Sequence, residues 1–138
     1  MDSLRAASEI AFSGLTAQSM RLRIVAENIA NSESTGSKPG ADPYRRKTIS
    51  FANELNSVSG ATHVKITEVG VDKSAFRIEH NPGHPAADAN GNVKMPNVNM
   101  IVEMTDMKQA TRSYEANLQV IKQGRDMSMS LIDLLRGT

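Results

Sequence analysis

The sequence predicts a mainly α protein in which two long terminal helices pair as an antiparallel, coiled-coil-like hairpin, with a small irregular β insert between them. Apolar residues recur at alternating spacings of four and three near both ends of the 138-residue chain, a pattern typical of helices that pack on other helices. The middle of the chain instead carries turn-forming residues and short alternating stretches. We therefore expect three parts: an N-terminal helix over 1–31, a loop and β-rich insert over 32–98, and a C-terminal helix over 99–138.

The first helix is predicted from positions 4, 8, 11, 15, 18, 22, 25 and 29, which read Leu, Ser, Ala, Leu, Gln, Leu, Val and Ile. Asp2 or Ser3 offers an N-cap oxygen, and no proline occurs before Pro39. A stretch rich in Ser, Gly and Pro begins after Asn31. The sequence thus predicts one uninterrupted helix that ends near Asn31.

The second helix is predicted from positions 104, 107, 111, 114, 118, 121, 125, 128, 132 and 135, most of which are apolar. Asn97 or Asn99 can cap its start after Pro96, and Gly137 supplies a stop. Gly14 and Gly124 interrupt the two helices at a cost of about 1 kcal/mol each relative to alanine. They are compatible with either a close backbone approach or a bend, and the sequence does not choose between these.

The insert is expected to hold a loop over 32–43 and strands over 44–51 and 64–71, with a further short strand over 76–78. Asn90-Gly91 is a strong turn signal, but the apolar content beside it is too low to require a regular hairpin. The basic run Arg45–Lys47 is typical of a solvated face or of a partner for acidic neighbours, and the solvated face is favoured.

Composition excludes several classes of function. A formal charge of +1 gives no field that would gather phosphates, so no nucleic-acid partner is expected. The chain has no cysteine. Its apolar runs are too short for a transmembrane span or a signal-peptide core, so we expect no membrane insertion. Aromatic residues make up only 4% of the chain. Such a thin core favours stabilisation by neighbouring subunits.

No catalytic, cofactor-binding or metal-binding site is predicted. His80 and His84 are four residues apart, but Asn81-Pro82-Gly83 between them prevents a shared helix face, so a turn with solvent-facing imidazoles is favoured over a metal site. Nucleophile, phosphate-loop and dinucleotide motifs are absent from the sequence. We therefore expect a protein that is not an enzyme and binds no cofactor.

Several stretches together resemble the flagellar basal-body rod protein family, and within it the proximal-rod type. The resemblance spans nearly the whole chain and includes the helical Asn-x-Ala-Asn signature at 28–31. Its more specific parts are Pro-Gly-His-Pro at 82–85, Met-Pro-Asn-Val at 95–98 and Arg-Ser-Tyr-Glu-Ala-Asn at 112–117. Further stretches are 13–15, 26–27, 42–46, 86–91, 103–104 and 110–111.

The resemblance implies a structural subunit that polymerises through its terminal helices into a hollow helical drive shaft and transmits torque. Implied partners are copies of itself and other rod subunits, the basal-body base and MS ring, and the flagellar type III export apparatus. The implied location is the periplasmic rod, reached without a cleaved signal peptide. The residues expected to pack between helices and subunits are Leu15, Leu22, Val25, Asn28, Ile29, Asn31, Met104, Met107, Tyr114, Asn117, Leu118 and Ile121.

Among these residues, Asn28, Asn31 and Asn117 are predicted to form hydrogen bonds between subunits.

Two other classes of protein share part of the pattern. A soluble coiled-coil adaptor or export chaperone would carry the same apolar stripes but would form a closed oligomer of defined mass. A His-dependent metal enzyme would bind zinc through His80 and His84. Binding of the first helix to a membrane surface is less favoured, because Asp2, Glu9 and Glu27 dilute its basic character.

Overall fold

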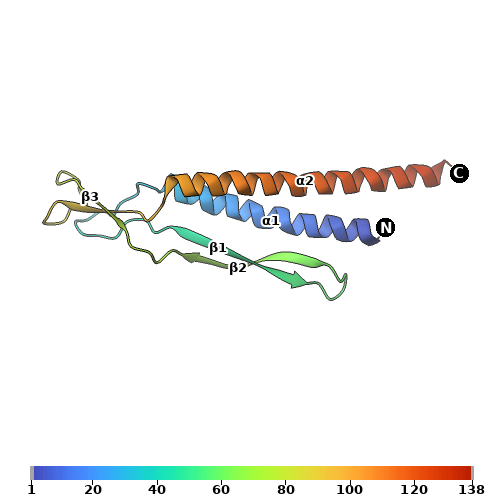
Figure 1. Ribbon diagram of the computed structural model, residues 1–138, viewed down its shortest axis with the longest axis horizontal. Coiled ribbons are helices and arrows are strands. Elements are labelled where there is room, and N and C mark those ends of the chain that lie inside the picture. Colours follow the sequence, from blue (N-terminus) through green and yellow to red (C-terminus); the bar gives the residue numbers. More distant parts are fainter. Residues whose placement is uncertain (1, 138) are drawn as a thin grey trace. The chain divides into compact units, whose positions relative to one another are not determined.

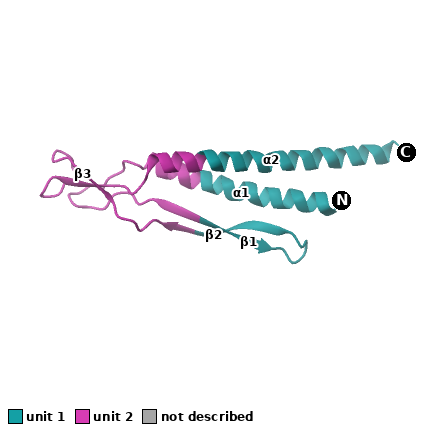
Figure 2. Ribbon diagram, viewed as in Figure 1, with its two compact units in different colours: residues 1–22, 50–68, 108–138 teal, residues 23–49, 69–107 magenta. Residues whose placement is uncertain are grey.

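The structure is a computed structural model that describes residues 2–137. Its elements follow the order α1 (Asp2–Ala30), β1 (Lys47–Leu55), β2 (Thr62–Val71), β3 (Arg77–His80), β4 (Asn92–Met95) and α2 (Met100–Arg136) (Figure 1). The chain divides into two compact units (Figure 2). Unit 1 holds residues 1–22, 50–68 and 108–138, and unit 2 holds residues 23–49 and 69–107.

Both long helices are confirmed, as α1 over Asp2–Ala30 and α2 over Met100–Arg136. Helix α1 has 29 residues and α2 has 37. Asn99 is the N-cap of α2, because its Oδ1 accepts hydrogen bonds from the amides of Ile101 (3.1 Å) and Val102 (3.3 Å). Within residues 2–137, neither helix has an apolar stretch of the length that crossing a bilayer requires.

The insert consists of two separate two-stranded sheets, β1–β2 and β3–β4. The two long strand predictions are confirmed with shifted ends, and the short one falls on β3. The sequence does not predict strand β4, because only two of its four residues, Val93 and Met95, are apolar. It pairs antiparallel with β3, from Arg77 opposite Met95 to His80 opposite Asn92.

The Asn90-Gly91 turn is present, but it closes a longer connection over residues 81–91. Gly91 has φ 77° and donates its N–H to Asp88 O at 3.0 Å. A side chain at this backbone position would be strained, so glycine is required here. The tight hairpin that this dipeptide often makes is therefore replaced by a loop that ends at β4.

Unit 1 contains contacts between the N-terminal part of α1 and the C-terminal part of α2. Arg21 Nη2 donates to Gln109 Oε1 at 3.1 Å. A Cβ built on Gly14 would lie 2.9 Å from Asn117 Nδ2, and one on Gly124 would lie 2.8 Å from Ser8 Oγ. Both glycines therefore sit where another helix comes close, which settles the choice that the sequence left open.

Small residues contribute to the buried face of each helix, together with Ile24 and Val25 of α1. Ala11 and Ala17 of α1 and Ala110 of α2 are buried, whereas Leu15 and Leu22 are only half-buried. Small side chains are expected where helices pack closely, because they let the backbones approach each other. Unit 2 has its own apolar core, formed by Ala86, Val93 and Met95 with the partly buried Ala87.

Near the start of α2, the face that is buried within the chain lies one residue before the predicted stripe. Glu103 and Ala110 are each 0% exposed, whereas Met104, which the stripe included, is 57% exposed. One residue rotates a helix face by about 100°, so the two alternatives point in clearly different directions. The spacing of apolar residues favours Met104 as the inward-facing residue, but within the chain it is the neighbouring Glu103 carboxylate that is buried.

Candidate functional site

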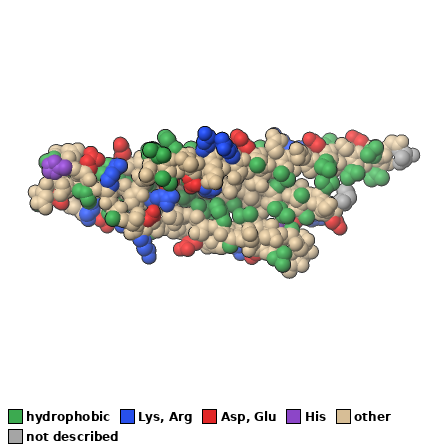
Figure 3. Space-filling view, viewed as in Figure 1, with side chains coloured by type: hydrophobic (Ala, Val, Ile, Leu, Met, Phe, Trp, Pro, Cys, Tyr) green, Lys and Arg blue, Asp and Glu red, His purple; other side chains and the backbone are tan. Residues whose placement is uncertain are grey.

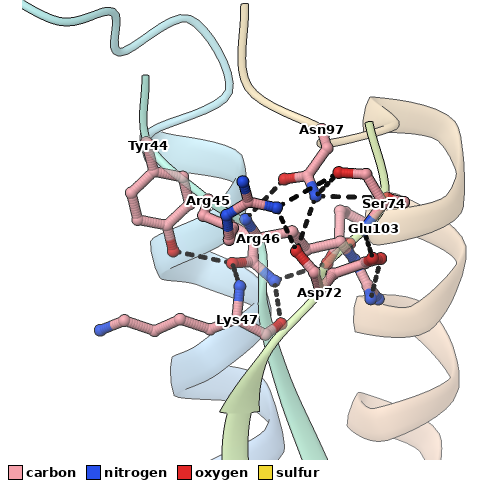
Figure 4. A network of polar contacts seen from close by, with 9 residues as sticks. Tyr44, Arg45, Arg46, Lys47, Asp72, Ser74, Asn97 and Glu103 are labelled. Atoms are coloured by element: carbon pink, nitrogen blue, oxygen red, sulfur yellow. Dashed lines mark hydrogen bonds and ion pairs between the residues drawn. The ribbon is translucent and has the colours of Figure 1, made fainter. Parts of the chain in front are cut away.

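A network of polar side chains in unit 2 joins α1, β1 and α2 (Figure 4). At its centre, Glu103 of α2 is 0% exposed and Asn28 of α1 is 1% exposed. Glu103 forms an ion pair with Arg46 through the guanidinium Nε, and its other carboxylate oxygen accepts a hydrogen bond from Asn28 Nδ2 at 3.3 Å. A buried carboxylate needs such partners, since leaving the charge unpaired would cost several kcal/mol.

Asn28 uses all of its side-chain hydrogen-bonding groups within the chain. Besides its bond to Glu103, its Nδ2 donates to Lys47 O at 2.9 Å, and its Oδ1 accepts from Lys47 N–H at 2.9 Å. The Tyr44 hydroxyl donates to the same Oδ1 at 2.8 Å. The amide thus bonds both backbone groups of Lys47, as a neighbouring strand would, and fixes the residue at which β1 begins.

A second amide, that of Asn97, holds the segments that precede α2 and follow β2. Its Oδ1 accepts the Arg46 N–H at 2.8 Å, and its Nδ2 donates to Asp72 O at 2.9 Å and to Ser74 O at 3.2 Å. Arg45 adds a bond from Nη1 to Asp72 O at 3.0 Å. Backbone groups from two separate stretches of sequence, at Arg46 and at Asp72–Ser74, are therefore satisfied around one side chain.

The basic run 45–47 is consequently not a solvated face. The Arg45 guanidinium lies over the Phe76 ring, 4.2 Å from its centroid, which is close enough for a cation–π contact. Arg46 pairs with Glu103 and with Asp72 (3.6 Å), and Lys47 Nζ lies 2.7 Å from Glu27 Oε2. The alternative named at the sequence level, a partner for acidic neighbours, is the one that the structure adopts.

These pairings shift the ionisation of the groups involved. The hydrogen bond from Lys47 lowers the pKa of Glu27 and raises that of Lys47 itself. Hydrogen bonds from Ser74 lower the pKa of Asp72. Burial disfavours the charged form of Arg46, but its bond to Glu103 outweighs that effect and raises the pKa of the guanidinium. The charged forms of these four groups are therefore the stabilised ones.

The network has the features of a structural site and not those of a catalytic or metal-binding site. Its carboxylates are paired with cations or hydrogen-bonded, and no group of three His, Cys, Asp or Glu side chains within residues 2–137 has the arrangement of a metal site. His84 Nδ1 accepts the Ala86 N–H at 3.0 Å, so this imidazole takes part in the turn. What the arrangement can do is hold the insert and the two helices of unit 2 in one conformation.

The sequence-predicted packing residues occupy three kinds of environment. Val25 and Asn28 are buried, and Met104 is exposed. The others are half-buried: Leu15, Leu22, Ile29, Asn31, Met107, Tyr114, Asn117, Leu118 and Ile121.

Each of the three asparagines expected to bond a neighbouring subunit has a partner inside the chain. Asn31 Nδ2 donates to Glu27 O at 2.9 Å, and Asn117 Nδ2 donates to Ser113 O at 2.9 Å. Asn28 makes the four bonds described above and has no group left to offer another molecule.

Sequence reasoning missed Glu103, Arg46, Tyr44 and Asn97 as members of a site. A charged residue on a helix is usually solvent-facing, and nothing in the spacing marks Glu103 as buried. One usable signal existed, since all four residues lie inside stretches that carry the resemblance described above.

Comparison with known proteins identifies the family. Residues 9–38 match the family described as "Flagella basal body rod protein", and residues 89–134 match "Flagellar basal body rod FlgEFG protein C-terminal". The flagellar basal-body rod protein FlgC of Agrobacterium fabrum is 62% identical over 138 residues, which cover 100% of this chain and 99% of that relative. The chain belongs to the flagellar basal-body rod protein family.

More distant members of the same type extend along most of the chain. FlgC of Escherichia coli O6:H1 is 41% identical over 129 residues, and FlgC of Bacillus subtilis is 36% identical over 140 residues. In both cases 91% of this chain and 93% of the relative are covered. The chain is thus a FlgC-type structural subunit of the rod and not an enzyme, and a soluble adaptor is not favoured.

Proposed function

We propose that this subunit lies in the proximal part of the rod and that its two helices pair antiparallel as a coiled-coil-like hairpin. The contacts between α1 and α2 support the direction of pairing, because residue numbers rise along one helix as they fall along the other. The contact pairs are Asn28 with Glu103, Arg21 with Gln109, Gly14 with Asn117 and Ser8 with Gly124. The two residue numbers of each pair add up to nearly the same total, as an antiparallel register requires.

The outer faces of this hairpin are proposed to be covered by neighbouring subunits. Exposed apolar side chains are concentrated at both ends of α2. Those near its start are Met100, Ile101, Val102 and Met104, and those near its end are Met127, Met129, Leu131, Ile132, Leu134 and Leu135. Exposed apolar side chains that gather in this way are typical of interaction sites.

The half-buried residues of the helices belong to the same proposal. Each would pack one side within the chain and the other against a neighbour: Leu15, Leu22 and Ile29 from α1, and Met107, Tyr114, Leu118 and Ile121 from α2. Val25 packs inside and Met104 outside. Asn28, Asn31 and Asn117 would then act by positioning helices.

The partners proposed are copies of this chain and other rod subunits, together with the basal-body base, the MS ring and the flagellar type III export apparatus. The location proposed is the periplasmic rod, where helical assembly would build a hollow shaft that transmits torque. A network of paired charges such as that around Glu103 suits this role, because it would make the connection of α1 and α2 to β1 rigid.

A single experiment tests this function. The gene is deleted from a bacterium that encodes it and is replaced by a copy that carries a tag at Val58. This exposed residue lies in the connection between β1 and β2. Purified basal bodies are then imaged. Loss of motility on deletion, its return with the tagged copy, and label at the base of the rod are expected. Label elsewhere in the basal body would contradict the proximal position, and normal motility of the deletion strain would contradict the function.

A further inference from the structure

The outer edge of β3 is an exposed strand edge on unit 2. Within residues 2–137, β3 pairs with β4 alone, in a two-stranded sheet. All four residues of β3 are exposed, and Ile78 is 56% exposed. Acidic, basic and hydrophobic side chains all reach the surface in this part of unit 2 (Figure 3). An edge of this kind offers backbone N–H and C=O groups to a further strand.

The pairing of β3 with β4 determines which backbone groups point outward. Asn81, directly after β3, donates its N–H to Gly91 O at 2.9 Å and continues the register of the two strands. In an antiparallel pair, residues whose backbone groups face the partner strand alternate with residues whose groups face away from it. Arg77 and Glu79 therefore turn their backbone groups toward β4, and Ile78 turns its N–H and C=O outward.

His80 shares the outward orientation of Ile78. Beyond the β3–β4 ladder, the backbone groups of these two residues form no hydrogen bond with the described part of the chain. Their N–H and C=O groups are therefore available to a second strand.

The side chains beside Ile78 carry opposite charges at positions that match a second copy of the same strand. Arg77 and Glu79 are exposed, and neither has an ion-pair partner among the residues that the structure describes. When two β3 strands lie antiparallel with Ile78 opposite Ile78, Arg77 of each copy lies opposite Glu79 of the other. Directly opposed residues of opposite charge stabilise an antiparallel pair. This edge is thus complementary to itself.

The charges also select this register among those that the outward-facing groups allow. With Ile78 opposite His80, the two Glu79 side chains would face each other, and like charges directly opposite destabilise a sheet. With His80 opposite His80, Ile78 would lie opposite Pro82, which has no N–H to donate. The register centred on Ile78 avoids both problems.

We propose that two free copies of the chain associate through the outer edges of β3, with Ile78 opposite Ile78 across a two-fold axis. The Ile78 N–H of each copy donates to the Ile78 C=O of the other. Two ion pairs between Arg77 and Glu79 flank these bonds, and a four-stranded sheet with β4 at both edges results. The contact is small, so the dimer is weak and transient.

This contact goes beyond the proposed function and differs in kind from the contacts that build a rod. A two-fold contact uses the same surface on both copies and closes after two of them. A rod that grows by adding copies in one orientation uses contacts between two different surfaces instead. The β3 contact therefore belongs to copies outside the rod, where it covers an edge that would otherwise be a template for aggregation.

Cysteine cross-linking tests the contact, because the chain has no cysteine of its own. In the proposed register the Cα atoms of the two Ile78 residues are about 5.5 Å apart, a distance that a disulfide spans. The purified Ile78→Cys chain is oxidised, and the covalent dimer is measured after denaturation. Val58→Cys, in the connection between β1 and β2 and 95% exposed, is the matched control.

We expect about ten times more covalent dimer from Ile78→Cys than from Val58→Cys, because only the first pair of cysteines is held within reach of a disulfide. Equal yields would overturn the proposed contact.

Reversal of the two charges tests the register. Arg77→Glu and Glu79→Arg, each introduced into the Ile78→Cys chain, place like charges opposite each other at two positions. Each is expected to lower the dimer yield about tenfold, and the two together are expected to restore at least about half of it. Each yield is divided by the rate at which the same thiol reacts with a small disulfide reagent, because nearby charges alter thiol reactivity.

The control for this reversal is Lys65→Glu with Glu54→Lys, which inverts an exposed ion pair of the other sheet and should leave the yield unchanged. Equal yields from all the charge variants, or no recovery when the two β3 charges are reversed together, would reject the pairing.

Amide hydrogen exchange supplies a readout that involves no cysteine. Exchange at the Ile78 N–H should slow as the concentration of the wild-type chain is raised, because this group is bonded only in the dimer. Exchange at the Glu79 N–H, which faces β4, should not change with concentration. Exchange at Ile78 that is independent of concentration would contradict association through this edge.

Discussion

Two buried polar residues, Glu103 and Asn28, connect the helices of unit 2 to the first strand. Their hydrogen bonds reach backbone groups as well as side chains, so they decide where β1 begins and not only how strongly it is held. A hydrophobic pair of the same size could fill the space but could not bind both the N–H and the C=O of Lys47. We infer that the network specifies one conformation, as buried polar groups do in some other proteins.

Replacing Glu103 with glutamine tests this at a single atom. The change keeps the shape but removes the ion pair with Arg46, and we expect the free energy of unfolding to fall by about 3 kcal/mol. Chemical denaturation of the purified chain measures it. Glu115→Gln, at an exposed position on the same helix, is the control and should change stability by less than about 0.5 kcal/mol. Equal effects of the two variants would contradict a structural role for Glu103.

The lowered pKa values of Glu27 and Asp72 predict loss of stability in acid. Their ordinary values are 4.5 and 3.8, so the unfolded chain binds protons before the folded chain does as the pH falls. The stabilisation is complete above about pH 4.5 and is lost as the pH drops through the lower folded-state values.

Melting temperatures between pH 7 and pH 3 check this acid dependence. The wild-type chain should lose stability below about pH 4.5, and the Glu27→Gln, Asp72→Asn double variant should lose less over the same interval. Parallel curves for the two proteins would show that other carboxylates cause the acid sensitivity.

At the scale of whole elements, the sequence predicts the helices well and their packing faces less well. Spacing, caps and stops locate α1 and α2 because these signals are local, as the Asn99 cap illustrates. The face that becomes buried depends on what packs against it. Ala110 and Glu103 carry little or no hydrophobic signal, so the apolar spacing runs through Met104 instead, which is exposed in the single chain. The sequence does not indicate the short strand β4 for a similar reason, because β4 forms through its pairing with β3.

The two helix glycines give a prediction whose sign depends on their neighbours. Alanine in place of Gly14 gains about 1 kcal/mol of helix propensity, but its Cβ meets the Asn117 amide group, and such overpacking costs about 1 to 3 kcal/mol. We expect Gly14→Ala to destabilise the wild-type chain and to stabilise the Asn117→Ala variant. Thermal unfolding of the four proteins measures this reversal.

Gly124 provides the matched control for this cycle. Only the Ser8 hydroxyl, the end of a side chain that can rotate away, lies within 4 Å of an added Cβ. Gly124→Ala should therefore be neutral or stabilising by up to about 1 kcal/mol. Destabilisation by Gly14→Ala in both backgrounds would mean that the Asn117 contact is not its cause.

For the molecule as a whole, the main feature is how much apolar surface it leaves uncovered. The sequence indicates this through a low content of aromatic residues and two apolar stripes that one partner helix cannot fully cover. It does not indicate where the surface lies, because that depends on the relative lengths and register of two helices far apart in sequence. The exposed end of α2 follows from that register.

Truncating Leu22 and Leu118 together tests whether the half-buried stripe serves assembly. Both side chains are only half-buried in the single chain, so isolated Leu22→Ala, Leu118→Ala protein should keep its helices, as measured by circular dichroism. In the rod each truncation costs about 2 kcal/mol per subunit, and the cost recurs in every copy. We therefore expect loss of motility and few complete basal bodies. The exposed neighbours Ser19 and Gln119, changed to alanine together, should leave motility intact. Normal swimming of the leucine variant would mean that contacts between subunits do not depend on this stripe. A loss of packing free energy that recurs in every copy would otherwise weaken the assembled rod.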